Sequence, residues 1–389
     1  MAEPIETAYI HIPFCKSKCL YCDFISYAGQ EDRMDAYFKM LVREIHLVDS
    51  FYRHSREDRR RPLKSVYFGG GTPSFVPSRY IVRVLAELKE RFEFSTDAEI
   101  TIECNPGTVD LSKFHDYREA GVNRISIGLQ STSDPLLKGI GRIHTFAEFE
   151  QCMDYADQTG FVNRNVDLMF GLPSQTMADV KTSIQLVLER NLSHVSFYSL
   201  ILEEGTPFYN KYYKNPDLLP SEDLEREMYW TGVEEFEKNG FMHYEISNLA
   251  KQDCLCNQNI AYWKTREYFG FGAGAHSYQQ ETRIENDSDI GSYIRRMQSF
   301  EGDSNAPAAI AKNSITKKEQ EQEFFMLGFR LLEGVDIAEF ERLFKKKADA
   351  YIPGLEKLTR KGYLIRQGGN FRLTKKGIDF ANQVFIEFV

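Results

Sequence analysis

The chain has 389 residues, of which 42% are hydrophobic and 27% charged, and this predicts two or three globular domains, or one barrel with an appendage. Its formal net charge of −9 does not favour bulk binding to nucleic acid. No run of about 18 apolar residues occurs, and the acidic start, Met-Ala-Glu-Pro-Ile-Glu, lacks the apolar core of a signal peptide, so we expect neither a membrane span nor export.

The first 200 residues alternate short β-rich runs with amphipathic helical patterns. Strands are predicted at residues 9–12, 65–68, 99–103, 124–127, 165–169 and 194–199. Helical patterns between them include residues 34–48, 80–91 and 180–189. Alternation of this kind predicts βα units around a parallel sheet. We therefore expect the α/β class, as an incomplete (β/α)6 barrel of the TIM type, with an open doubly wound sheet as the alternative.

Three cysteines follow the first predicted strand. Cys15, Cys19 and Cys22 have the spacing C-x3-C-x2-C, and three thiolates can each bind one iron of a [4Fe–4S] cube. The fourth iron then lacks a protein ligand, which suits chemistry on a bound molecule. We predict a cluster at these three residues. Reduced thiols of this kind need a reducing compartment, so we expect a cytoplasmic protein.

This spacing, with Tyr21 before the third cysteine, resembles the radical S-adenosylmethionine (SAM) superfamily. The resemblance implies that SAM binds the open iron and is cleaved by an electron from the cluster, giving methionine and a 5′-deoxyadenosyl radical. It also implies an electron donor of the flavodoxin or ferredoxin type. The run from Tyr9 to Cys15 is similar to a narrower branch, which contains oxygen-independent coproporphyrinogen III oxidases and the HemW-type heme chaperones.

In a barrel of parallel strands, functional residues gather at the carboxyl ends of the strands. A glycine-rich run, Gly-Gly-Gly-Thr-Pro at 69–73, follows the second predicted strand, and without Cβ atoms the backbone can approach a ligand closely. Polar residues end or follow the later strands. The resemblance implies that Arg142 pairs with the SAM carboxylate. It implies a SAM site made of Tyr9, Gly70, Gly71, Thr72, Glu103, Gln130, Arg142 and Asp167.

The other cysteines carry a weaker signal. Cys104 and Cys152 are expected in the core, because free cysteines are commonly buried. Cys254 and Cys256 lie in a polar loop, where two thiols are too few for a structural zinc site.

Three parts are predicted along the chain: the core barrel at 1–240, a barrel extension and connecting segment at 241–300, and a winged-helix-like domain at 301–389. The last rests on helical patterns at 317–332, 337–344 and 353–361, a hairpin over 363–374, and a final helix from Lys376. This part is mildly basic. The resemblance nevertheless implies a coproporphyrinogen oxidase C-terminal domain that covers the barrel, and binding to nucleic acid is not expected.

Two functions remain within the resemblance. The oxidases have a fourth cysteine two residues after the third, and Phe24 stands there in this chain. The chain therefore looks like the heme chaperones, without coproporphyrinogen III oxidase activity, and we expect it to bind heme or another tetrapyrrole and to serve a heme-accepting client protein. A radical enzyme with a different substrate is a further alternative.

One feature departs from the chaperone pattern. Its His-Asn-x-x-Tyr-Trp motif corresponds here to residues 258–263, where Gln258 replaces the histidine. An amide is not a usual ligand of heme iron, so another residue must ligate any bound heme. Aromatic residues expected near the barrel mouth, where they could pack against a macrocycle, are Phe24, Tyr198, Tyr262 and Trp263.

Overall fold

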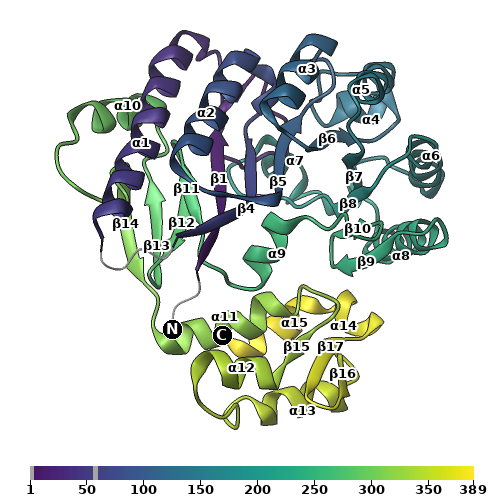
Figure 1. Cartoon of the computed structure of the whole chain (residues 1–389). Helices are drawn as coiled ribbons and strands as arrows, with labels where there is room; N and C mark the ends of the chain where they lie inside the picture. The colour runs from purple at the N-terminus through teal and green to yellow at the C-terminus, as the bar shows by residue number, and fades with distance from the viewer. Residues whose placement is uncertain (1–3, 56–59) are drawn as a thin grey trace.

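The structure is a computed structural model that describes residues 4–55 and 60–389. Residues 1–3, part of the acidic start considered above, lie outside the described ranges. A large body of strands and helices contains most of the chain, and a smaller C-terminal body lies beneath it in Figure 1. Within the described ranges, no helix has the length and apolar character that crossing a membrane requires.

A nine-stranded sheet organises the large body. Its order is β11-β1-β4-β5-β6-β7-β8-β10-β9. Each of the six predicted strands is present, and these six run parallel in chain order. Their bounds are β1 Ile5–Ile12, β4 Arg60–Gly70, β5 Phe94–Cys104, β6 Arg124–Gln130, β7 Asn163–Phe170 and β8 His194–Ser199.

Three short strands extend this sheet beyond the prediction. A parallel strand, β11 (Phe269–Phe271), pairs with β1, and two antiparallel strands, β10 (Asn248–Ala250) and β9 (Met242–Glu245), follow β8. The sheet keeps β11 and β9 as its two edges, so the described strands form no closed barrel. Strand order without a reversal excludes the doubly wound alternative, and the prediction of an incomplete barrel is confirmed.

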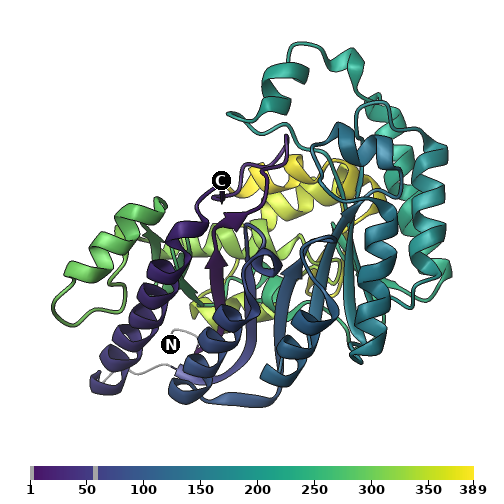
Figure 2. The ribbon, with the colours of Figure 1, turned by 90° about the horizontal axis from the view of Figure 1, so that it is seen from above.

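Helices cover the outer face of the sheet, as the view in Figure 2 shows. The three helical patterns named above are confirmed as α1 (Met34–His54), α2 (Ser78–Arg91) and α6 (Met177–Leu188). The helices between and after them are α3 Leu111–Ala120, α4 Asp134–Gly139, α5 Phe146–Gln158, α7 Pro207–Tyr212 and α8 Glu222–Lys238.

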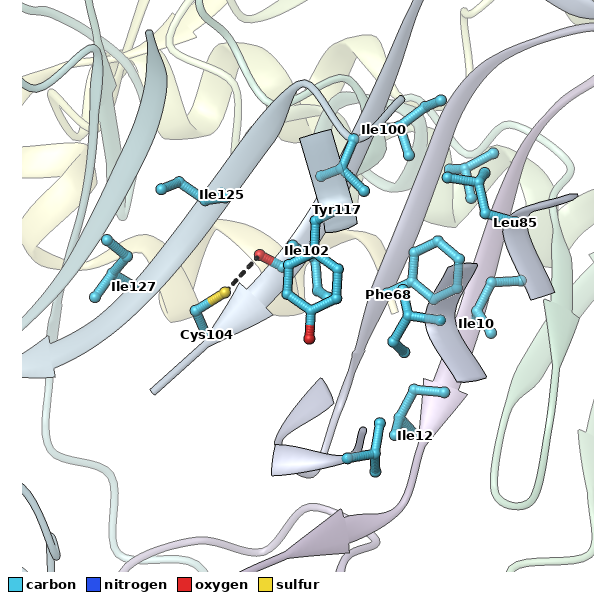
Figure 3. Close-up of a cluster of buried hydrophobic side chains, with 14 of the residues drawn as sticks. Ile10, Ile12, Phe68, Leu85, Ile100, Ile102, Cys104, Tyr117, Ile125 and Ile127 are labelled. Atoms are coloured by element: carbon cyan, nitrogen blue, oxygen red, sulfur yellow. Dashed lines mark hydrogen bonds between the residues drawn. The ribbon is translucent and has the colours of Figure 1, made fainter. Parts of the chain in front are cut away.

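The outer face of the strands is apolar and the inner face is polar, because successive strand residues point to opposite sides. Figure 3 shows part of the apolar layer, in which strand residues pack near Leu85 of α2 and Tyr117 of α3; they include Ile10, Ile12, Phe68, Ile100, Ile102, Ile125 and Ile127. Each such buried side chain stabilises the fold by about 1.5–3 kcal/mol. The intervening positions, such as Tyr67, Glu103 and Asp167, are therefore left to line the interior of the barrel.

The predicted helices and hairpin of the C-terminal body are confirmed as α11 (Lys317–Gly328), α12 (Ile337–Phe344), α13 (Ile352–Arg360), β16 (Leu364–Gln367) and β17 (Asn370–Leu373). A two-residue strand, β15 (Val335–Asp336), adds a third strand to the wing. Residues 324–388 supply a separate core, whereas the large body's core spans residues 5–308. The predicted boundaries at 240 and 300 stay predictions.

The other helices and strands of the chain are short. They are β2 Phe14–Cys15, β3 Tyr27–Ala28, α9 Asn257–Trp263, β12 His276–Gln279, β13 Thr282–Asn286, α10 Ile290–Ser299, β14 Ala309–Ser314, α14 Lys375–Asp379 and α15 Ala381–Phe385.

Glu44 ties α1 to the segment that follows β11. It is 2% exposed and accepts hydrogen bonds from the Gly272 backbone N–H at 2.8 Å, the Tyr293 hydroxyl at 2.7 Å and the Asn286 amide at 2.7 Å. Burial raises the pKa of this carboxyl to about 7, although the three hydrogen bonds act in the opposite direction.

This carboxyl predicts a pH-dependent loss of stability. The pKa is about 7 in the folded chain and ordinarily 4.5, so its contribution is complete below pH 4.5 and is lost as the pH rises through 7. The Glu44→Gln variant lacks this titration. We expect the free energy of unfolding of the wild type, relative to Glu44→Gln, to fall by about 2 kcal/mol between pH 5 and pH 8, as measured by urea unfolding. The exposed Glu90→Gln is the control and should keep the wild-type pH dependence; identical pH dependence in Glu44→Gln would contradict this account.

Candidate functional site

The cysteine loop is fixed to the end of the barrel by backbone hydrogen bonds. After β4, the Gly71 N–H donates to the Ile12 carbonyl at 2.9 Å, and the Thr72 N–H donates to the Phe14 carbonyl at 2.8 Å. A Cβ atom on Gly71 would lie 2.8 Å from the Phe14 carbonyl oxygen. Only glycine therefore permits this approach between the two loops.

These bonds also decide what the glycine loop can present to a ligand. The N–H groups of Gly71 and Thr72 are used, and the Gly70 N–H donates to Glu103 Oε2 at 3.2 Å. A ligand at this loop meets carbonyl oxygens, which suit a cationic ammonium better than an anion. Gly70 adopts φ +110°, a conformation that favours glycine.

One cavity of about 360 Å³ contains nearly all the predicted site residues. The exception is Tyr9, whose hydroxyl lies 3.0 Å from His11 Nδ1 and whose ring stacks on Tyr67. Ten of the eleven predicted positions line the cavity: Cys15, Cys19, Cys22, Gly70, Gly71, Thr72, Glu103, Gln130, Arg142 and Asp167. Strand ends and loops that are far apart in sequence thus meet at the carboxyl end of the barrel, where the fold predicts a site.

The three thiols line one cavity. A [4Fe–4S] cube would offer each thiolate its own iron. Among the described residues, no three His, Cys, Asp or Glu side chains converge on one point where a single metal ion could be held. Burial raises the pKa of the Cys15 and Cys22 thiols, so a nearby cation is needed to keep them as thiolates. The Thr72 hydroxyl lies 3.5 Å from Cys15 Sγ and can donate to it.

Arg142 connects the cluster loop to the rest of the cavity. Its Nη1 lies 3.5 Å from Cys19 Sγ, and its Nη2 donates to Asn105 Oδ1 at 2.7 Å and to the Gly128 carbonyl. Its Nε is buried and has no hydrogen-bond partner in the described chain. A buried guanidinium with an unused N–H fits a carboxylate ligand.

Two carboxyl groups lie deeper in the cavity. Burial, reinforced by the negative charge of Asp167, raises the pKa of Glu103 to about 7, while the Tyr67 hydroxyl donates to Glu103 Oε1 at 2.9 Å. Burial also raises the pKa of Asp167, which accepts a hydrogen bond from the Asn165 amide at 2.7 Å. Two partly desolvated carboxyl groups would be stabilised by a cationic ligand between them.

Gln130 is held in a strained backbone conformation. Its φ is +76°, and its side-chain oxygen accepts a hydrogen bond from the Tyr198 hydroxyl at 3.0 Å. A left-handed conformation in a residue other than glycine persists only where the surroundings impose it, and such residues cluster at functional sites.

Several residues of the cavity were not predicted. They include Ile201 and Glu203, which line it together with Met169 and Ser199. No motif marks Ile201 or Glu203, and the available signal is that both follow the sixth strand, β8. Ile201 and Phe24 are 64% and 63% exposed, so the mouth has an apolar rim.

The prediction that Tyr262 and Trp263 share this mouth is wrong. Both belong to α9, whose Asn257 N–H donates to Glu99 at 3.1 Å and whose Gln258 accepts from the Ser65 hydroxyl at 3.1 Å. Ser65 and Glu99 lie midway along β4 and β5, and neither Tyr262 nor Trp263 lines the cavity that contains the cysteines. Phe24 and Tyr198 do line the cavity. Cys104 and Cys152 are buried in the core, as predicted.

Family models match both bodies of the chain. The Radical SAM superfamily matches residues 9–187, and the HemN C-terminal domain matches residues 315–380. The heme chaperone HemW of Bacillus subtilis (strain 168) is 35% identical over 99% of this chain and 99% of its own length. The heme chaperone HemW of Lactococcus lactis subsp. lactis (strain IL1403) is 34% identical over 100% of this chain and 98% of its own length. The heme chaperone HemW of Escherichia coli (strain K12) is 33% identical over 99% of this chain and 98% of its own length.

A solved structure shares the whole fold. Coproporphyrinogen III oxidase (HemN) from Escherichia coli, a radical SAM enzyme, superposes with a TM-score of 0.83 over 100% of this chain and 90% of that chain, at 21% identity. At this identity the likeness concerns the fold alone, and it confirms the predicted core with its C-terminal domain.

The cysteine assignment predicts which thiols hold iron. Changing Cys15, Cys19 or Cys22 to Ala removes one ligand of the cluster, so anaerobically reconstituted protein should lose its iron and its visible absorption. Cys254→Ala, outside the cavity, is the matched control and should bind iron as the wild type does. A triple Ala variant that reconstitutes with about four irons per chain would refute the assignment.

The free N–H of Arg142 predicts a role in SAM affinity. Arg142→Lys keeps the charge but loses the planar fork, so the affinity for SAM should fall about tenfold. The measurement is the perturbation of the reduced cluster's EPR spectrum as SAM is added, at equal iron content. Exposed Arg79→Lys serves as the control, and an unchanged titration in Arg142→Lys would remove this residue from the site.

Proposed function

The chain belongs to the HemW family of the radical SAM superfamily, and from this premise we propose that it is a heme chaperone rather than a coproporphyrinogen III oxidase. Superfamily membership implies a [4Fe–4S] cluster and SAM. Two observations together support the proposal. The chain is similar over its full length to proteins named heme chaperones, and Phe24 stands where the oxidases have their fourth cysteine.

We assign the cluster to Cys15, Cys19 and Cys22 and SAM to the remainder of the same cavity. The unused Nε–H of Arg142 would bind the SAM carboxylate. The carbonyl oxygens of the glycine loop and the Glu103 carboxylate would bind the ammonium. When bound, the cluster and SAM supply one-electron chemistry.

The other residues of the site orient the cofactor and shield it from water. Gln130 and Asp167 offer an amide and a carboxylate for sugar hydroxyls. Tyr9 lies outside the cavity lining and acts through Tyr67, whose hydroxyl donates to Glu103. Tyr9 is thus a positioning residue in this proposal.

Phe24 argues against the oxidase reaction. Its side chain is 63% exposed at the rim of the cavity, and an aromatic ring supplies neither a thiol nor a proton there. An exposed apolar rim suits contact with a macrocycle or with a client protein.

Partners and location complete the proposal. A heme-accepting client protein and an electron donor of the flavodoxin or ferredoxin type are expected. All seven cysteines are free thiols, which supports a reducing compartment such as the cytoplasm.

The proposal predicts heme binding without porphyrin production. Reconstituted protein, SAM and a reductant are incubated with coproporphyrinogen III, and the products are separated by chromatography; we expect no catalytic decarboxylation. Hemin is then titrated into the same preparation while the Soret band is followed, and we expect a saturable change.

Each alternative has its own outcome in these two assays. Decarboxylated porphyrin at catalytic turnover would replace the chaperone proposal with the oxidase. Absence of both activities would leave a radical enzyme acting on another substrate.

A further inference from the structure

A second cavity lies between the barrel and the C-terminal body, away from the cysteine loop. It has a volume of about 720 Å³, within the range of about 300–1,000 Å³ typical of small-molecule sites. Its walls come from β9, α9, the turn after α11, and the wing, which are neighbours in Figure 1. The cleft, as we call it below, is lined by Met242, His243, Tyr244, Leu255, Ile260, Lys264, Leu331, Leu332, Glu333, Ile365, Arg372, Leu373, Thr374 and Ile378.

The cleft lies toward the amino ends of the barrel strands. Leu255 lines both the cleft and a neighbouring hollow that is lined by Asp97, Asn123 and Asn163, which are at or near the starts of β5, β6 and β7. The cysteines and the SAM residues lie at the carboxyl ends. A ligand in the cleft is therefore separated from the cofactor cavity by the barrel interior and α9.

Aliphatic side chains dominate the walls of the cleft. Leu331 and Leu373 are 4% and 7% exposed, while Met242 and Ile365 are 51% and 41% exposed. The inner wall is thus buried and the entrance is apolar and open. Such a surface favours a largely apolar ligand that enters from solvent.

The polar groups of the cleft suit an acidic ligand. Lys264 and Arg372 line it with one carboxylate, Glu333, which pairs with Lys264 at 2.8 Å. The Glu333 side chain is 64% exposed, so this ion pair is weak, and Lys264 can exchange it for a ligand carboxylate. A ligand with an apolar body and two negative charges would place its body against the apolar walls and its charges near Lys264 and Arg372.

His243 offers a ligand for iron. Its Nε2 lies 3.3 Å from the Tyr229 hydroxyl and 3.4 Å from the Ile246 carbonyl oxygen. The Tyr229 hydroxyl donates to the Ile246 carbonyl at 2.7 Å, and the backbone of Ile246 and Glu245 also hydrogen-bonds the ring. In the tautomer with its proton on Nε2 the ring keeps its lone pair on Nδ1, the arrangement of histidines that bind metals through one nitrogen and donate from the other. Burial lowers the pKa of His243 to about 4, so the ring is neutral at physiological pH.

The position of the family's motif histidine is unsuited to heme in this chain. Gln258 is 1% exposed, and its side-chain oxygen accepts a hydrogen bond from the Ser65 hydroxyl inside the barrel. The opposite side of the same helix, at Ile260, lines the cleft.

We propose that heme binds in the cleft, with His243 as an iron ligand and with Lys264 and Arg372 binding its propionates. This inference rests on the proposed function. It adds the location of the heme, the ligand that replaces the motif histidine, and the separation of heme from the cluster by the length of the barrel.

The experiment titrates hemin into the full chain and follows the Soret band. His243→Ala should shift the Soret maximum and weaken binding by about tenfold or more, because the iron loses a ligand. Lys264→Glu should weaken binding about fivefold without moving the maximum, since it reverses a charge near the propionates. Lys39→Glu, on the outer surface of α1, is the matched control and should titrate as the wild type does.

Two further variants separate a loss of heme ligation from a loss of folding. His243→Gln keeps a neutral hydrogen-bonding side chain and should show the same Soret shift as His243→Ala, with the wild-type melting temperature. Phe24→Ala probes the other end of the barrel.

The outcomes separate this inference from the proposed function. If the wild type binds hemin saturably and the His243 and Lys264 variants leave both affinity and spectrum unchanged, the cleft is not the site and the chaperone proposal survives. Weaker binding in Phe24→Ala alone would place heme at the cluster end and overturn the inference. A wild type that does not bind hemin overturns both.

Discussion

The close contact between the glycine loop and the cysteine loop is the constraint on which the site depends. Two backbone hydrogen bonds, from Gly71 to Ile12 and from Thr72 to Phe14, join the loops that follow the first and second parallel strands. A single Cβ at Gly71 would collide with the Phe14 carbonyl. These bonds fix the start of the cysteine loop, next to Cys15, against the glycine loop, so contacts of the fold itself order part of the loop and lower the cost of ordering it on metal binding.

Much of the fold and of this site could be predicted because both follow from strand order. Each parallel strand is an apolar run bounded by a helix, and the six runs specify βα units. Once those units are arranged in chain order, every residue at a strand's carboxyl end is brought to one edge. That reasoning, together with the cysteine spacing, placed Glu103, Gln130 and Asp167 in one cavity with the thiols, although more than 60 residues separate the first of them from the last.

The elements that sequence patterns missed are short. The strands β9, β10 and β11 have three or four residues each, too few for a period of two to be distinguished from an irregular segment. The helix α9 has seven residues, so its period cannot show which end of the barrel it approaches. That is why Tyr262 and Trp263 were expected at the wrong end, and why no motif indicated the cleft.

The position of α9 also decides how the two ends of the molecule can communicate. Its Gln258 bonds Ser65 inside the barrel, while its Ile260 and the following Lys264 line the cleft. Between the ends lies a polar interior in which Arg124, 1% exposed, is paired only loosely with Glu99 at 3.9 Å. A ligand in the cleft does not touch the cofactor cavity, because the residues that line the two cavities are different. If heme binds in the cleft as proposed, α9 offers a route by which the cluster end could influence it, because this helix contacts both the barrel interior and the cleft.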